Sequence, residues 1–240
     1  MTQLKLYFIF ILFTVLSSRA QKNVGTLIIN IHPVFDGKEL VLSENAYVNA
    51  NGDSIYIDTF KFYFSNLCLS GTKPFCEKES YHLIDAENIS TLSFTLKDIP
   101  IANYSELSFE IGVDSLKNTK GVLTGDLDPI KGMYWAWNTG YIAAKLEGHS
   151  KVCKTLHNAF EFHIGGYLQP YRSLRKNKIS VGNLQISSTA VNTLELYADA
   201  AEWFKTPEKI DVSKINSIVL PNKQSVMMAD NYKDMIKFKK

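Results

Sequence analysis

The feature that most constrains the fold of this chain is an alternation of apolar and polar residues with a period of two. Every second residue is Leu, Ile, Val or Phe in five short segments, 27–31, 60–64, 107–113, 160–164 and 194–196. Successive side chains of a strand point to opposite faces, so this period is typical of strands with one buried face. Turns rich in Gly, Asn, Asp and Pro separate the segments. The pattern predicts an all-β fold, an antiparallel β-sandwich-like single domain.

One or two short helices are expected beside the strands. Residues 199–204 have the composition of a short helix, and Ser225 is a candidate N-cap for a second helix over 226–235. The chain has no internal repeat, low-complexity linker or charge-block boundary, so nothing indicates a second domain.

The first twenty residues have the features of a targeting segment. Lys5 precedes an apolar run at 6–16, and Ser18 and Ala20 supply the small residues that a signal peptidase reads. The run is too short to span a bilayer, and no second run follows it. We expect residues 1–20 to be a cleaved signal peptide and residues 21–240 to form the β domain. The mature protein would then be periplasmic or secreted, with no membrane span after cleavage.

Charge and motifs exclude several functional classes. The chain has 26 basic and 24 acidic residues, and removal of Lys5 and Arg19 with the signal peptide leaves 24 of each. A balanced charge gives no reason to expect a nucleic-acid partner. The sequence contains no nucleophile elbow, phosphate-binding loop or zinc-protease motif, so we do not expect an enzyme.

Three cysteines are present, and two of them flank a turn. Cys68 ends a strand-like run and Cys76 follows a Gly-Thr-Lys-Pro turn, so these two could form a disulfide in an oxidising compartment. Cys153 would then be unpaired. No Cys-x-x-Cys pair is present, which argues against a thiolate zinc or redox site.

Two of the three tryptophans, Trp135 and Trp137, lie two residues apart. In a strand this spacing puts both indoles on one face. They could form a wall of the core, or a stacking platform for a sugar or peptide. The second reading predicts a metal-free envelope protein that binds a glycan or another protein through an aromatic platform.

Several side chains could instead ligate a metal. His163 alternates with Phe162 and Ile164, so its side chain is expected to point away from the core, and the Gly165-Gly166 doublet after it allows close backbone approach. His32 could be a second ligand from another strand. Two methionines, Met227 and Met228, are candidate soft donors, or else core residues of the second helix.

The sequence is also compatible with a second kind of metal site. Carboxylates gather around a Gly-rich turn and could hold calcium, although they fit no EF-hand spacing and turn formation explains them equally well. These residues are Asp114, Asp126 and Asp128.

At these residues the chain resembles a known family, the MbnP-like copper-binding proteins, in the branch typical of Bacteroidetes. The resemblance is carried by GMYWAWNTGY at 132–141, KLEG at 145–148 and FHIGG at 162–166. Further segments fit the same family, namely 61–67, 111–115, 125–129 and Asn231. The resemblance therefore extends over nearly the whole mature chain.

The resemblance implies an exported protein that binds or handles copper. Some relatives bind one copper ion through histidine and a tryptophan oxidised to kynurenine, a modification made by a partner diheme peroxidase of the MbnH type. Transferred to this chain, the family pattern makes Trp135 the candidate for oxidation and His163 the candidate imidazole ligand. Relatives with a Trp-x-His pattern use that histidine as a further ligand, but this chain has Trp137 there. Tyr134 is a further candidate site residue.

Overall fold

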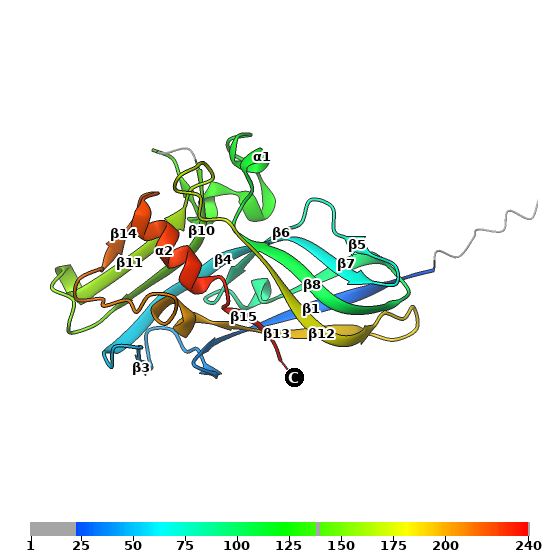
Figure 1. Ribbon diagram of the computed structural model, residues 1–240, viewed down its shortest axis with the longest axis horizontal. Coiled ribbons are helices and arrows are strands. Elements are labelled where there is room, and N and C mark those ends of the chain that lie inside the picture. Colours follow the sequence, from blue (N-terminus) through cyan, green and yellow to red (C-terminus); the bar gives the residue numbers. More distant parts are fainter. Residues whose placement is uncertain (1–22, 138–139, 240) are drawn as a thin grey trace, which may run out of the picture.

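The structure is a computed structural model that describes residues 23–137 and 140–239. The expected signal peptide, residues 1–20, lies outside this range. The strands form two sheets that run along the long axis of the molecule (Figure 1). The smaller sheet has five strands: β15 (Ile236–Phe238), β13 (Asn192–Asp199), β1 (Val24–Phe35), β2 (Lys38–Glu39) and, paired to β1, β7 (Ser93–Pro100).

The larger sheet has ten strands and carries the candidate site. Its main path is β12 (Arg175–Gln185), β8 (Asn103–Ile111), β4 (Ser54–Gly71), β10 (Gly140–His149), β11 (Ala159–Gly165) and β14 (Ser217–Ile218). Four short strands pair with this path: β3 (Ala46–Val48), β5 (Phe75–Cys76) and β6 (Tyr81–Asp85) with β4, and β9 (Tyr134–Trp135) with β10. The all-β, sandwich-like fold is thus confirmed.

Strand direction differs from the expectation in two places. Among the described residues, β1 pairs with β13 in parallel and β11 pairs with β14 in parallel, so the sheets are mixed and not wholly antiparallel. Parallel neighbours need a crossover connection, and the chain between β1 and β13 runs through every strand of the larger sheet except β14. The alternation of apolar residues cannot reveal this, because it is the same in both directions.

The predicted helices are present with shifted bounds. Residues Ala200–Phe204 form a 3-10 helix, η5, whose N-cap is Asp199. The second helix, α2, spans Lys223–Tyr232 and begins earlier than expected, because Asn222 is its N-cap and Ser225 completes a capping box from the third position. The other helical elements are α1 (Ser115–Asn118), η1 (Ile89–Thr91), η2 (Gly125–Leu127), η3 (Pro129–Lys131) and η4 (Leu156–Asn158). Within the described ranges, none of the helices has the length and apolar character needed to cross a membrane.

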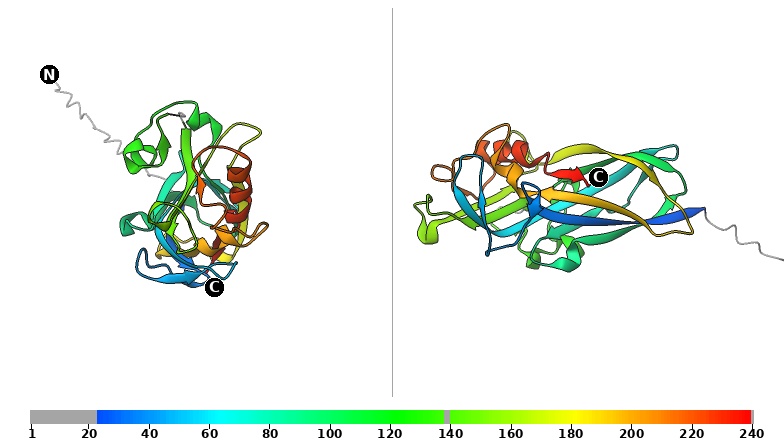
Figure 2. Two further views of the ribbon diagram at one scale, coloured as in Figure 1. Left: turned by 90° about the vertical axis from the view of Figure 1, so that its left-hand side faces the viewer. Right: turned by 90° about the horizontal axis from the view of Figure 1, so that it is seen from below.

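The main core fills the space between the two sheets. Leu27, Ile29 and Ile31 of β1 are buried there, as are Phe62 of β4 and Phe162 of β11. Figure 2 shows the two layers from two further directions, with α2 at one side of the molecule near one end. In each strand, the residues that alternate with these buried ones point to the outer face of their sheet. On the larger sheet, another part of the chain packs against this outer face.

Candidate functional site

A covering segment, residues 112–137, packs against the outer face of the larger sheet. It contains α1, η2, η3 and β9, and buries a second apolar cluster that is separate from the main core. Tyr63 shows which face this is, because it belongs to the second cluster whereas its neighbours Phe62 and Phe64 belong to the main core. The other buried members of the second cluster are Leu83, Val113, Leu127, Met133, Trp135, Tyr141 and Ile142.

Trp135 is part of this second cluster and lies over β11. The short strand β9 pairs Trp135 with Gly140, and only 5% of the tryptophan is exposed. A Cβ atom at Gly165 would lie 2.6 Å from Cζ3 of the indole, which is closer than real Cβ contacts. The absence of a side chain at Gly165 therefore lets the indole rest on the strand backbone, as the glycine doublet predicted.

His163 lies on the same strand, two residues before Gly165. Its neighbours Phe162 and Ile164 are fully buried in the main core, so the imidazole points to the outer face, as the alternation predicted. Residues two apart on a strand share a face and are separated by about 7 Å. Trp135, through its contact with Gly165, and His163 therefore lie on the same face of the larger sheet, although they are 28 positions apart in sequence.

The imidazole of His163 contacts a carboxylate from the next strand. Its Nε2 lies 2.6 Å from Oε1 of Glu147 in β10, and both side chains are partly buried. This hydrogen bond lowers the pKa of the Glu147 carboxyl to about 2, outweighing the partial burial that would raise it. A further hydrogen bond to Thr59 and the charge of Lys145 act in the same direction.

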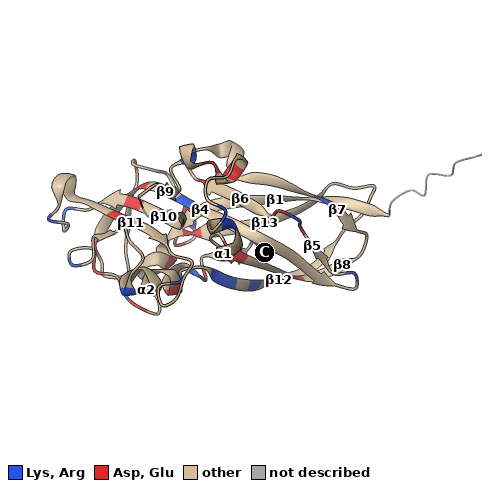
Figure 3. Ribbon diagram, turned by 90° about the horizontal axis from the view of Figure 1, so that it is seen from above, with Lys and Arg blue, Asp and Glu red and all other residues tan. Residues whose placement is uncertain are grey.

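Lys145 connects this polar group to the covering segment. It lies opposite His163 in the β10–β11 ladder, and its Nζ donates a hydrogen bond of 2.8 Å to the carbonyl of Gly132. Burial lowers the pKa of the Lys145 ammonium group. Figure 3, which views the molecule from above, shows acidic and basic residues interspersed over β4, β10 and β11.

The two neighbouring aromatic candidates differ in exposure. The ring of Trp137 lies 5.8 Å from that of Trp135, between centroids, but 63% of Trp137 is exposed. Tyr134 is half-buried and packs edge-on against Tyr141 at 5.0 Å. The structure therefore brings the Trp135–Trp137 pair together, with one indole covered and the other facing solvent.

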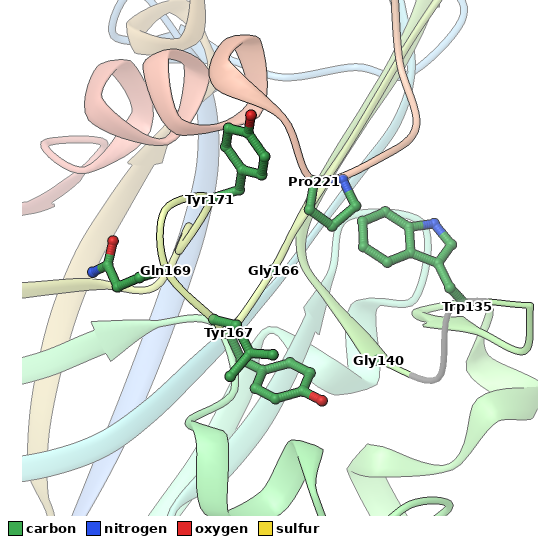
Figure 4. Close-up of a pocket in the computed structure, with 8 residues that line it drawn as sticks. Trp135, Gly140, Gly166, Tyr167, Gln169, Tyr171 and Pro221 are labelled. Atoms are coloured by element: carbon green, nitrogen blue, oxygen red, sulfur yellow. The ribbon is translucent and has the colours of Figure 1, made fainter.

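A cavity of about 220 Å³ opens beside Trp135. The loop after β11 provides Tyr167 and Tyr171, and Pro221 precedes α2. Figure 4 shows the indole of Trp135 next to Pro221 on one side, with the two tyrosines on the other. The rest of the lining is Gly140, Gly166, Leu168 and Gln169. A small, largely apolar pocket of this kind suits a single ring-sized group.

His32 is not near this site. It lies on β1 of the smaller sheet, alternating with the buried Ile31, and its Nε2 is 2.6 Å from Oε2 of Glu195. His32 and His163 thus point to the outer faces of different sheets, with the main core between them. Sheets pack about 10 Å apart, whereas metal–imidazole bonds are about 2 Å long, so the two histidines do not share one ion.

The two candidate methionines of α2, Met227 and Met228, are also away from the outer face. Met228 is fully buried in the main core, and Met227 packs against that core from a partly buried position. The two residues are therefore core residues of the second helix, the alternative to metal ligands that the sequence left open. Thioethers fill irregular gaps readily, and α2 uses both in that way.

The three aspartates considered for calcium have separate partners. Asp114 caps α1 and accepts a hydrogen bond from Tyr81, and Asp128 caps η3. Asp126 binds Lys131 at 2.6 Å and the backbone N–H of Leu83 at 3.2 Å. In the two described ranges of the chain, no group of three or more His, Cys, Asp or Glu side chains could hold a metal ion.

The cysteines divide as the spacing suggested. Cys68 of β4 lies opposite Cys76 of β5, and the two form a disulfide. Cys153 is free and buried, and its thiol donates to the carbonyl of Val212 at 3.3 Å. Burial raises the pKa of the Cys153 thiol, so this residue has the properties of a core residue.

Sequence reasoning did not identify Glu147. The signals available were that Glu147 lies in the KLEG segment, and that Lys145 and Glu147 occupy outward positions of an alternating strand, like His163 on its own strand. Which of them meets the histidine depends on the register of β10 against β11, and that register comes from the fold.

In solved structures, MbnP from Methylosinus trichosporium has a similar fold, with a TM-score of 0.55 and 13% sequence identity over 81% of this chain and 80% of that chain. At this identity the likeness shows the fold alone. No curated protein matches the chain. The sequence profile of the MbnP family matches residues 24–228, which is most of the chain, and the chain therefore belongs to the MbnP family.

Proposed function

We propose that this protein is an exported, non-enzymatic copper-binding or copper-handling protein. Family membership supports a copper-related function at the level of the family. The observation that carries the proposal for this chain is the indole of Trp135 resting on Gly165, two residues along the strand from His163. The expected signal peptide, residues 1–20, supports a periplasmic or secreted location.

The residues present fit copper under one condition. An imidazole nitrogen suits Cu(II), and His163 provides one on this face, while its Nε2 lies 2.6 Å from the Glu147 carboxylate. The described residues offer no third His, Cys, Asp or Glu beside them, so a further donor is needed. Unmodified indole does not serve, because its nitrogen carries a proton and acts only as a donor of hydrogen bonds.

Oxidation of Trp135 would provide that donor. Oxidation across the C2–C3 bond of the indole, followed by hydrolytic loss of the formyl carbon, gives kynurenine, which has an aniline nitrogen and a ketone oxygen. A diheme peroxidase of the MbnH type is the proposed partner, with peroxide as the oxidant that takes the electrons. In this proposal the modification precedes tight copper binding.

The test compares oxidised and unoxidised protein. Protein exported by the native host should carry oxidised Trp135, detected by peptide mass spectrometry, and should bind copper tightly. Protein produced without the peroxidase should have an intact Trp135 and bind copper much more weakly. Equal affinity of the two forms, measured by competition with a copper chelator, would show that the indole has no part in the site.

His163 is tested by substitution. His163→Ala should abolish tight copper binding by the oxidised protein, because it removes the imidazole donor on this face. His32→Ala is the matched control, since His32 also pairs with a glutamate at 2.6 Å but lies on the other sheet, so its copper affinity should equal that of wild type. Unchanged affinity in His163→Ala refutes the ligand assignment.

A second candidate function is favoured by the cavity beside Trp135. The exposed Trp137 and the aromatic lining of the cavity, Tyr167 and Tyr171, suit a sugar ring or an aromatic side chain of a peptide. In that case the purified protein would contain no metal, and tryptophan fluorescence would change on titration with a glycan or peptide. Metal analysis of natively exported protein separates the two functions.

A further inference from the structure

The carboxylate of Glu147 contacts His163 at one defined nitrogen. Lys145 lies directly opposite His163 in the β10–β11 ladder, and Glu147 follows two residues later on the same outer face. From this diagonal position Oε1 of Glu147 lies 2.6 Å from Nε2 of the imidazole. The side chains are 19% exposed for His163 and 31% for Glu147, so water competes only partly for this bond.

The chemistry of the two groups fixes the direction of the hydrogen bond. A glutamate is ionised at neutral pH and can only accept hydrogen bonds. The Nε2 atom of His163 must therefore carry the proton. In a neutral imidazole the other nitrogen then keeps its lone pair, and this neutral form is the one that ligates metals.

We propose that Glu147 is a positioning residue that holds His163 in its Nε2–H tautomer, so that Nδ1 is the nitrogen offered to copper. The inference rests on the proposed function, because it concerns the same site. Carboxylates that bind the second nitrogen of a metal-ligating histidine fix both its tautomer and its ring orientation. Lys145, with Nζ 3.9 Å from the same Oε1, helps to keep the carboxylate in place.

The first readout is the tautomer itself, measured without copper. Long-range proton–nitrogen NMR spectra distinguish which ring nitrogen carries the proton, and the metal-free wild-type protein should show His163 as the Nε2–H form. Glu147→Gln should give a mixture of the two tautomers, because an amide can donate as well as accept. A wild-type protein with the proton on Nδ1 overturns the inference.

The second readout is copper affinity. Glu147→Gln in the oxidised protein should weaken copper binding by about 10- to 100-fold, the range found when such supporting partners are removed. Glu77→Gln is the matched control. It disrupts a similar pair, in which Nε2 of His82 lies 2.8 Å from a Glu77 oxygen. His82 lies opposite the core residue Phe64 in the β4–β6 ladder, so Glu77→Gln should leave copper affinity unchanged.

The possible outcomes separate the inference from the proposed function. If Glu147→Gln alters neither the tautomer nor the affinity, or if Glu77→Gln lowers the affinity as much, Glu147 has no positioning role. If the wild-type protein shows the expected tautomer but its oxidised form binds no copper, the proposed function fails and the tautomer assignment stands.

Discussion

At Gly165 the covering segment packs directly against the backbone of the larger sheet. The indole of Trp135 lies where a side chain of residue 165 would be, with Cζ3 2.6 Å and Cη2 2.7 Å from the Cβ position. The carbonyl oxygen of Tyr141 lies 2.7 Å from the same point. Any larger residue there must displace the indole, the backbone of β10, or both. The position of Trp135 relative to His163 thus depends on the absence of a Cβ atom at residue 165.

Substitution of Gly165 tests this dependence. Gly165→Ala should lower the free energy of unfolding by about 1–3 kcal/mol, the usual effect of overpacking, and should change tryptophan fluorescence because the indole moves. Urea unfolding followed by fluorescence measures both. Glu161→Ala, at an exposed position of the same strand, is the control and should change stability by no more than about 0.5 kcal/mol. Equal stability of Gly165→Ala and wild type would contradict the packing described here.

At the scale of elements, one buried amide ties α2 to η5 and to the loop after it. Asn231 is 1% exposed, and its Nδ2 donates to the carbonyls of Trp203 at 2.9 Å and Glu208 at 2.6 Å. Its Oδ1 accepts from the N–H of Glu208 at 3.1 Å. The same side chain therefore ties α2 to η5 and to the loop after it. This gives a structural reason for an asparagine at this position of the sequence.

Removal of that amide should destabilise the docking of α2. Asn231→Ala leaves backbone groups of Trp203 and Glu208 without their partner, and a buried unsatisfied group costs about 1–3 kcal/mol. We expect at least this loss in the free energy of unfolding, measured by thermal or urea denaturation. Gln224→Ala, on an exposed position of the same helix, should have little effect. A loss as large for Gln224→Ala would mean that helix propensity, and not the buried amide, is responsible.

For the whole molecule, carboxylates with lowered pKa couple stability to pH. The pKa of Glu147 falls to about 2 in the folded state from an ordinary value of 4.5, because His163 donates a hydrogen bond to the carboxylate. Hydrogen bonds from histidine or lysine also lower the pKa of Glu195, Asp36 and Asp211. The folded state therefore binds these protons less readily than the unfolded chain does.

The sign of the resulting pH dependence follows from these shifts. A lowered folded-state pKa stabilises the protein fully above the unfolded value, and the stabilisation is lost as pH falls through the folded value. Stability should thus decrease between about pH 4.5 and about pH 2, with Glu147 contributing at most about 3 kcal/mol. Denaturant unfolding at a series of pH values measures this, and Glu147→Gln should flatten the curve. An unaltered slope in that variant would show that other carboxylates account for the effect.

The sequence by itself determined much of the secondary structure and the family. Five alternating segments located β1, β4, β8, β11 and β13, and the tryptophan and FHIGG motifs identified the MbnP family. The alternation around His163 also gave the direction of its side chain. These properties are local, because the face to which a strand residue points depends only on its immediate neighbours.

Only the tertiary structure decided which outward-facing residues meet. It separated His32 from His163 by the main core, paired His163 with Glu147, and laid Trp135 over Gly165. It also made β1 and β13 parallel neighbours. These contacts depend on strand order and register, which are set by how distant segments bury their apolar faces together, and a period of two is the same for every order and both directions.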